Sequence, residues 1–169
     1  MAQKNQLSFV LTSISRIQTL YLLLSIVALA LSAVFPIAKF YGDFSYILKI
    51  FTFKSMSDMI PDPEKFIFNL PIVIIWAAII IMNLITIFLF NKRRTQMNLL
   101  SISIGLVLAM IALIFFYYSP NIEKHYNVVT EYNKCAGIYM PLISFVCMIL
   151  AYRNIRKDDK LVKSLDRIR

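Results

Sequence analysis

The sequence contains few charged residues, three glycines, two cysteines and one histidine. Charged residues make up 16% of the 169-residue chain and hydrophobic residues 59%, whereas an average soluble domain is about 25% charged. A soluble domain of ~150 residues buries only about 70% of the surface of its unfolded chain, so it could not hide this much apolar surface. The scarcity of glycine, together with runs rich in Ile, Leu and Phe, excludes low complexity and disorder for most of the chain. We therefore expect the excess apolar side chains to face lipid.

The shortage of metal-binding residues argues against a catalytic or cofactor-binding role. A metal site needs several converging ligands, yet His125 is the only histidine, so one chain cannot supply two axial histidines to a haem. Cys135 and Cys147 are 12 residues apart, which is about 18 Å along one helix and beyond the reach of a disulfide. The sequence has no glycine-rich phosphate loop and no Gly-x-Ser-x-Gly or His-Glu-x-x-His motif. We predict that the chain is not an enzyme and needs no cofactor or metal.

Four hydrophobic stretches contain no acidic or basic residue, namely 17–38, 67–90, 97–118 and 135–152. About 20 apolar residues in a helix cross a bilayer core of about 30 Å, so each stretch predicts a span, and the fourth is the shortest. The first exceeds the 7–15 residues typical of a signal-peptide core and is interpreted as a retained span. The sequence predicts an all-α membrane protein in which residues 1–169 form one four-transmembrane-helix bundle. Ion-coupled carriers usually hold an ionisable residue at membrane depth, so the pattern argues against pumps and leaves a passive facilitator open.

The charges outside these stretches are distributed unequally. Twelve Lys or Arg residues and three acidic residues lie in segments 1–16, 91–96 and 153–169. Six Lys or Arg residues and six acidic residues lie in segments 39–66 and 119–136. The positive-inside rule places the basic side, with both termini, in the cytoplasm. Because topology accounts for the basic balance and no soluble basic domain is present, we predict no nucleic-acid partner.

The two segments on the other side have two alternative interpretations. Residues 39–66 and 119–136 contain β-rich stretches such as Phe44–Phe53 and His125–Tyr132, which predict a small extracytoplasmic β element. Aromatic residues that rest at headgroup depth would explain the same composition without a sheet.

Small residues at helical spacing predict helix packing, because helices in lipid associate through close contact and interhelical hydrogen bonds. Two such stripes stand in the first and third spans, namely Ser25, Ala28 and Ser32, and Ser101, Gly105 and Ala109. Packing within the protein's own bundle is the favoured interpretation, and a seam for a partner or for a second copy is the alternative. Asn83 and Thr86 are the polar pair that we expect to bond to another helix.

The segment 153–169 is a basic C-terminal tail with an apolar face. With the turn between the second and third spans, it predicts a cytoplasmic contact surface that includes Lys92, Arg93, Arg94, Arg156, Lys157, Leu161 and Leu165. Attachment to anionic lipid headgroups and docking of a protein partner are both open.

Two segments near the ends of the chain carry distinctive motifs, namely Ile14–Leu24, which includes Arg16-Ile-Gln18-Thr, and Ala151–Arg169, which includes Lys157-Asp-Asp159. In both segments the chain resembles an uncharacterised four-span family of Bacteroidota. The likeness covers about residues 14–169, with Met1–Ser13 as an additional stretch. The resemblance implies a bacterial inner-membrane protein of four spans, but it supplies no activity and no catalytic residue.

These observations predict an accessory or scaffolding subunit of a larger membrane complex, because packing seams and a patterned tail are present while catalytic motifs are absent. A small passive facilitator is one alternative. A membrane-surface regulator that acts through the basic tail is another.

Overall fold

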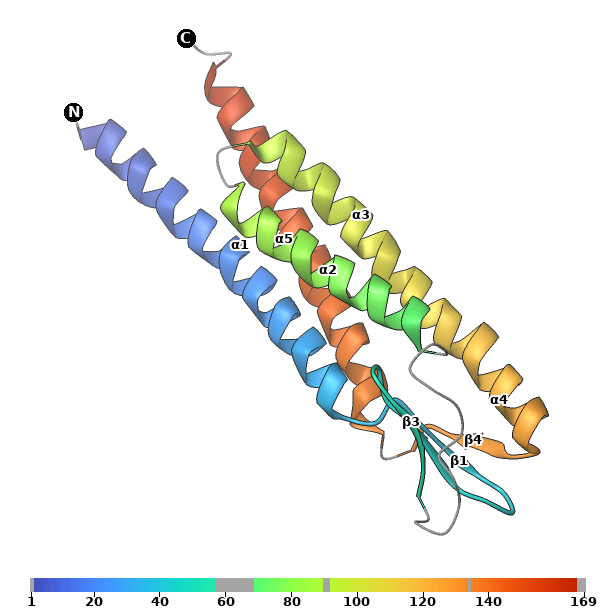
Figure 1. The fold of residues 1–169 in the computed structure, drawn as a ribbon. Helices are drawn as coiled ribbons and strands as arrows, with labels where there is room; N and C mark the ends of the chain where they lie inside the picture. Colours follow the sequence, from blue (N-terminus) through green and yellow to red (C-terminus); the bar gives the residue numbers. More distant parts are fainter. Residues whose placement is uncertain (1, 57–68, 90–91, 134, 167–169) are drawn as a thin grey trace.

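Helices form most of the structure and run along one common direction (Figure 1). The computed structural model describes residues 2–56, 69–89, 92–133 and 135–166, with side chains between Ile17 and Lys160. The helices are α1 (Ala2–Val34), α2 (Leu70–Phe88), α3 (Arg93–Ala112), α4 (Ser119–Tyr126) and α5 (Ala136–Asp166), and a π-helical segment, η1 (Leu113–Tyr118), joins α3 to α4. With α3, η1 and α4 counted as one helix, four described helices are long and apolar enough to cross a membrane.

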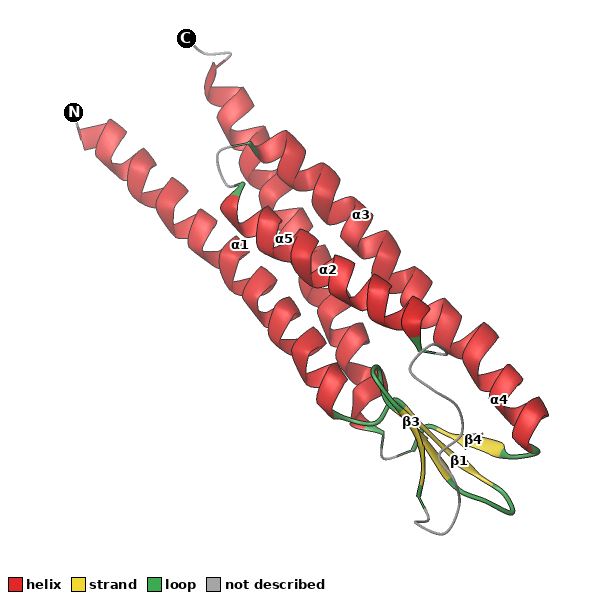
Figure 2. Cartoon of the chain, viewed as in Figure 1, coloured by secondary structure: helices red, strands yellow, loops and turns green. Residues whose placement is uncertain are grey.

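A small antiparallel sheet lies at the end of the bundle opposite to the chain termini (Figure 2). Its strands are β1 (Ala38–Tyr41), β2 (Tyr46–Leu48), β3 (Phe53–Ser55) and β4 (Val129–Glu131), in the spatial order β3-β2-β1-β4. Of the two interpretations of segments 39–66 and 119–136, the sheet is confirmed. We call this the sheet end of the bundle, and we call the opposite end, where both termini lie, the terminal end.

The sheet forms because its aromatic side chains share one buried face. Phe40, Tyr46 and Phe53 are buried, and their rings pack at centroid distances of 6.1 Å for Phe40–Phe53 and 5.6 Å for Tyr46–Phe53. Successive residues of a strand point to opposite faces of a sheet. These aromatic residues point to the same face, so the sheet has one apolar face and one solvated face. Three of the strands come from one continuous stretch, and β4 arrives from the segment after α4.

Two predicted span boundaries are wrong at the sheet end. The helix predicted over 17–38 ends at Val34, because Pro36 cannot donate a backbone hydrogen bond and disfavours helical geometry at the residue before it. The helix predicted over 97–118 continues to Tyr126. It ends at Asn127, which takes the left-handed conformation with φ 52° that often terminates a helix.

Helix α5 runs unbroken from Ala136 to Asp166, so residues 153–166 of the predicted tail continue the helix of the fourth hydrophobic stretch. Its contact with α1 is the most extensive of any two described elements. At 1.5 Å per residue α1 is about 50 Å long and α5 about 46 Å, and both exceed a bilayer core of about 30 Å. Figure 1 shows their outer ends extending past the turn between α2 and α3 at the terminal end.

Candidate functional site

The contact between α1 and α5 follows a matched alternation of three and four residues. The buried positions are Gln18, Leu22, Ser25, Leu29 and Ser32 in α1, and Ser144, Met148, Ala151, Ile155 and Asp158 in α5. This spacing averages 3.5 residues and keeps one face of each helix against its partner, as in coiled-coil packing. Polar residues interrupt both series, and in a buried contact each of them needs a partner.

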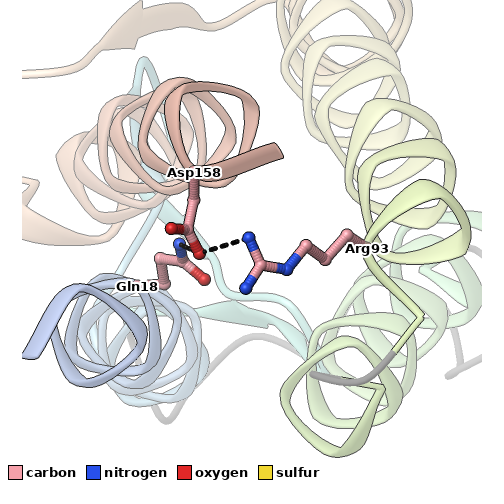
Figure 3. Close-up of polar contacts among 3 residues, drawn as sticks. All are labelled: Gln18, Arg93 and Asp158. Carbon is pink, nitrogen blue, oxygen red and sulfur yellow. Dashed lines mark hydrogen bonds and ion pairs between the residues drawn. The ribbon is translucent and has the colours of Figure 1, made fainter. Parts of the chain in front are cut away.

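Asp158 is the most unusual member of this contact, because its carboxylate is buried at the terminal end with 2% of the residue exposed. Figure 3 shows Arg93 of α3 and Gln18 of α1 approaching it from two sides. The Arg93 Nη1 atom lies 2.8 Å from Asp158 Oδ2. The Gln18 Nε2 atom donates a hydrogen bond to the same oxygen over 3.5 Å, the long limit for such a bond. The three residues, which we call the terminal clamp, join α1, α3 and α5.

The Arg93–Asp158 contact is an ion pair rather than a well-aligned hydrogen bond. The N–O distance is short, but Arg93 Nη1 lacks hydrogen-bond geometry, and Asp158 Oδ1 has no hydrogen-bond partner among the described residues. Arg93 enters from the bundle edge, and 29% of its side chain is exposed. A buried carboxylate of this kind depends on its cation, because removing one partner leaves an uncompensated charge.

A second polar cluster joins α1, α2 and α5 nearer the middle of the bundle. The Ser25 and Ser144 Oγ atoms are 2.7 Å apart, and Asn83 Nδ2 donates to Ser25 Oγ over 3.1 Å. All three residues are fully buried. Asn83 Oδ1 has no hydrogen-bond partner among the described residues. The cluster therefore ties three helices together, and none of its three residues lines the cavity at the sheet end that is described below.

Two further side chains bond to the backbone of a neighbouring helix. Trp76 Nε1 of α2 donates to the Leu29 carbonyl of α1 over 2.9 Å, and Gln96 Nε2 of α3 donates to the Thr86 carbonyl of α2 over 3.1 Å. Such bonds fix the relative position of helices in a setting where apolar burial alone is weakly specific.

At Gly137, near the sheet end, the start of α5 lies against the backbone of the segment that follows α1. The Gly137 N–H donates to the Pro36 carbonyl over 2.9 Å. A Cβ atom at this position would lie 2.5 Å from the Pro36 oxygen and 2.6 Å from the Phe35 oxygen. Only glycine lets the start of α5 come this close to the end of α1.

The ionisable groups at the sheet end are not arranged as activated nucleophiles. Burial raises the pKa of Tyr132 above its usual value, although its hydroxyl lies 2.5 Å from Ser119 Oγ and that hydrogen bond lowers the pKa. Burial likewise raises the pKa of the Cys135 thiol, so its reactive thiolate form is disfavoured. Among the residues that the structure describes, no group of three or more His, Cys, Asp or Glu side chains could hold a metal ion.

The predicted cytoplasmic contact surface is divided by the structure. The exposed members are Lys92, Arg94, Arg156 and Lys157, all at the terminal end. Arg93 instead turns inward and pairs with Asp158, so it belongs to the bundle as well as to its edge. Leu161 and Leu165 lie in the helical continuation of α5, beyond the residues whose side chains are described.

The two small-residue stripes take different positions. Ser25, Ala28 and Ser32 are buried. Ser101, Gly105 and Ala109 are exposed, and among the described residues nothing lies within 4 Å of a Cβ added at Gly105, so this stripe lies on the open side of α3. The buried face of α3 consists instead of Gln96, Leu100, Ser103, Val107 and Met110. A constant spacing of four residues drifts around a helix of 3.6 residues per turn, whereas alternation of three and four stays on one face.

The fold thus defines a four-helix bundle with polar interhelical contacts and a small sheet at one end. Residues 14–168 match the model of a family described as a domain of unknown function (DUF4293). Because the match covers nearly the whole chain, the chain belongs to this family. Comparisons with curated proteins and with solved structures give no match.

Sequence analysis did not assign a role to Gln18 or Asp158, although both stand in the terminal segments that carry the family resemblance. By sequence alone, Asp158 is only one residue of the basic tail 153–169. The sequence signal that could have identified Asp158 is the series Ala151, Ile155 and Asp158, which are spaced by four and three residues and are buried in α5. That series places the carboxylate on the packed face of α5.

Proposed function

We propose that this chain is a non-catalytic integral protein of the bacterial inner membrane, and that it serves as an accessory or scaffolding subunit of a larger membrane complex. The main support is the use of its buried polar groups. The terminal clamp and the Ser25–Asn83–Ser144 cluster bond helices to one another. Polar groups used in this way stabilise one arrangement of a bundle, as a structural subunit requires.

The terminal end is the surface that we assign to partner binding. Its exposed cations include Lys92, Arg94, Arg156 and Lys157, and the outer parts of α1 and α5 extend past the turn between α2 and α3 (Figure 1). The clamp fixes the position of α5 against α1 and α3 just where this surface begins. A rigid helix pair with a basic surface offers a partner a defined shape as well as charge.

The same charges support a topology in which the terminal end is cytoplasmic and the sheet end is extracytoplasmic. The segments at the terminal end carry 12 Lys and Arg and three acidic residues, whereas the sheet-end segments carry six of each. An excess of Lys and Arg in short segments beside membrane spans sets the orientation of bacterial membrane proteins.

Reporter fusions and a transport assay test this proposal. A reporter enzyme that is active only outside the cytoplasm should be active when fused after Tyr41 or after Tyr126. A reporter that is active only inside the cytoplasm should be active when fused after Arg169. An extracytoplasmic C-terminus would contradict the topology. Purified protein in liposomes should leave solute permeability unchanged, and saturable uptake of a small solute would instead establish the facilitator alternative.

A further inference from the structure

A cavity of about 640 Å³ lies at the sheet end, between β3 and the helix formed by η1 and α4. Its walls include three aromatic side chains, Phe53, Tyr117 and Tyr126, and three polar ones, Asn121, Lys124 and His125. Its volume falls within the range of about 300–1,000 Å³ typical of small-molecule sites. The hydrogen bonds and the ion pair between the described helices involve other residues than Asn121, Lys124 and His125.

The aromatic wall is held in place by the sheet. Phe53 and Tyr126 pack with ring centroids 5.8 Å apart, and Tyr126 also packs on Tyr46 of β2 at 5.0 Å. On the helix, Tyr117, Asn121 and Lys124 follow at spacings of four and three residues, so they share one face. The cavity therefore has an apolar side and a cationic end that are both fixed by regular structure.

The charge at this cavity favours an anionic ligand. Lys124 and His125 line it. The neighbouring carboxylate is used elsewhere, because Glu123 Oε1 accepts a hydrogen bond from the Thr130 N–H over 2.9 Å. Cations in the last turn of α4 also complement the helix dipole, but that role does not require a cavity or an aromatic wall.

The position of the cavity along the helix matches lipid headgroup depth. Lys124 stands 31 residues after Arg93 in one continuous helix, which is about 46 Å at 1.5 Å per residue. A bilayer with its headgroups is about 40–45 Å thick. If Arg93 lies at one polar surface, Lys124 reaches the other. Tyr117, about 36 Å from Arg93 by the same rise, then lies near the hydrocarbon border, and the adjacent Phe116 is 84% exposed.

We propose that this cavity binds the phosphate-bearing headgroup of an anionic phospholipid from the leaflet on the sheet side. The Lys124 ammonium pairs with the phosphate, the Asn121 amide donates a hydrogen bond to it, and the aromatic wall covers the glycerol and the start of the acyl chains. This inference rests on the proposed membrane insertion, but not on the accessory-subunit role.

Native mass spectrometry of the full chain tests the inference, with phosphatidylglycerol and phosphatidylcholine of identical acyl chains as the probes. The wild type should retain one phosphatidylglycerol in preference to phosphatidylcholine. Lys124→Gln should lower phosphatidylglycerol retention roughly tenfold, as expected when a charge-assisted contact is lost. Tyr117→Ala should weaken binding of both lipids through loss of the apolar wall.

Lys54→Gln is the matched control, because it removes the same charge from an exposed residue of β3 that follows Phe53 and so points to the opposite face of the strand. Equal losses in Lys54→Gln and Lys124→Gln, or no loss in Lys124→Gln, would overturn the proposal. Complete displacement of the lipid by millimolar inorganic phosphate would also overturn it, by showing a site for a free anion. Flotation of the wild type with liposomes after alkaline washing distinguishes failure of membrane insertion from failure of lipid binding at the cavity. Loss of the protein from the membrane would contradict insertion itself. Retained insertion without lipid binding that depends on Lys124 would contradict only this inference.

Discussion

Replacement of Arg93 by methionine should destabilise the bundle more than any other single loss of a basic residue at the terminal end. The change leaves the Asp158 carboxylate, 2% exposed, without its cation at 2.8 Å. Breaking a buried pair in this way typically costs about 3–5 kcal/mol. Because 29% of the Arg93 side chain is exposed and Gln18 still contacts the carboxylate, we expect a value of about 2–3 kcal/mol, below that range.

The reverse change, Asp158→Leu, should cost less, about 1 kcal/mol, because the long Arg93 side chain at the bundle edge can turn its charged end toward water. Combining the two substitutions should restore about 1–2 kcal/mol relative to the sum of their separate effects, since the double variant leaves no unpaired charge. Arg94→Met is the control, because Arg94 is the exposed neighbour of Arg93 and its loss should change stability by no more than about 0.5 kcal/mol.

Unfolding by sodium dodecyl sulfate in mixed micelles supplies the measurement, with tryptophan fluorescence as the signal. Trp76 is the sole tryptophan, and its indole N–H donates to the Leu29 carbonyl, so it reports the contact of α2 with α1. Additive effects of the two substitutions, within about 0.3 kcal/mol, would refute the interpretation of Arg93 and Asp158 as a coupled structural pair.

Three further predictions follow from the packing. Gly137→Ala should destabilise the bundle by about 1–3 kcal/mol, because its Cβ would meet backbone oxygens at 2.5 and 2.6 Å. Gly105→Ala is the control, since no described atom lies within 4 Å of its Cβ. It should be neutral or should stabilise the bundle by up to about 1 kcal/mol in the same assay. Ser25→Ala should cost about 1–2 kcal/mol, since it removes the acceptor of Asn83 Nδ2, and full stability would show that the cluster is dispensable. In a variant whose sole cysteine is Cys135, maleimide labelling should be slow in the native protein. The labelling rate should rise at higher pH than in the unfolded chain, because burial raises the pKa of the Cys135 thiol. Equal labelling rates in both states would contradict the burial of Cys135.

Hydrophobic stretches free of charge predicted the four long helices, because about 20 uncharged apolar residues in a row favour a helix that is apolar all round. The same property hid the helix faces. The exposed and buried sides are both apolar, so hydrophobicity does not separate the buried Leu22 from the exposed Leu23. The lengths of the helices were harder to predict, since α1 and α5 extend beyond the hydrophobic stretches into polar sequence.

The terminal clamp could not be predicted by charge alone, because Asp158 stands among exposed basic residues of the same helix. Its burial depends on α1 and α3, which supply Gln18 and Arg93 from distant parts of the sequence. Position along the 3.5-residue repeat is the local signal for such a residue, and the partners become evident only when three helices are placed together. The polar cluster at Ser25 shows the same rule, with Asn83 expected to bond to another helix but its partner set by the fold.

The proposed role as a subunit is tested most directly by quantitative mass spectrometry of the protein extracted in a mild detergent at its native expression level. The account predicts that a membrane-protein partner co-purifies in fixed stoichiometry with the wild type. The partner should be lost from a Leu161→Asp, Leu165→Asp double variant that still inserts, and it should be retained by Lys54→Gln, which changes the opposite end of the bundle. Recovery of the wild type as a monomer without a stoichiometric partner would contradict the account and favour a self-contained function in the lipid bilayer.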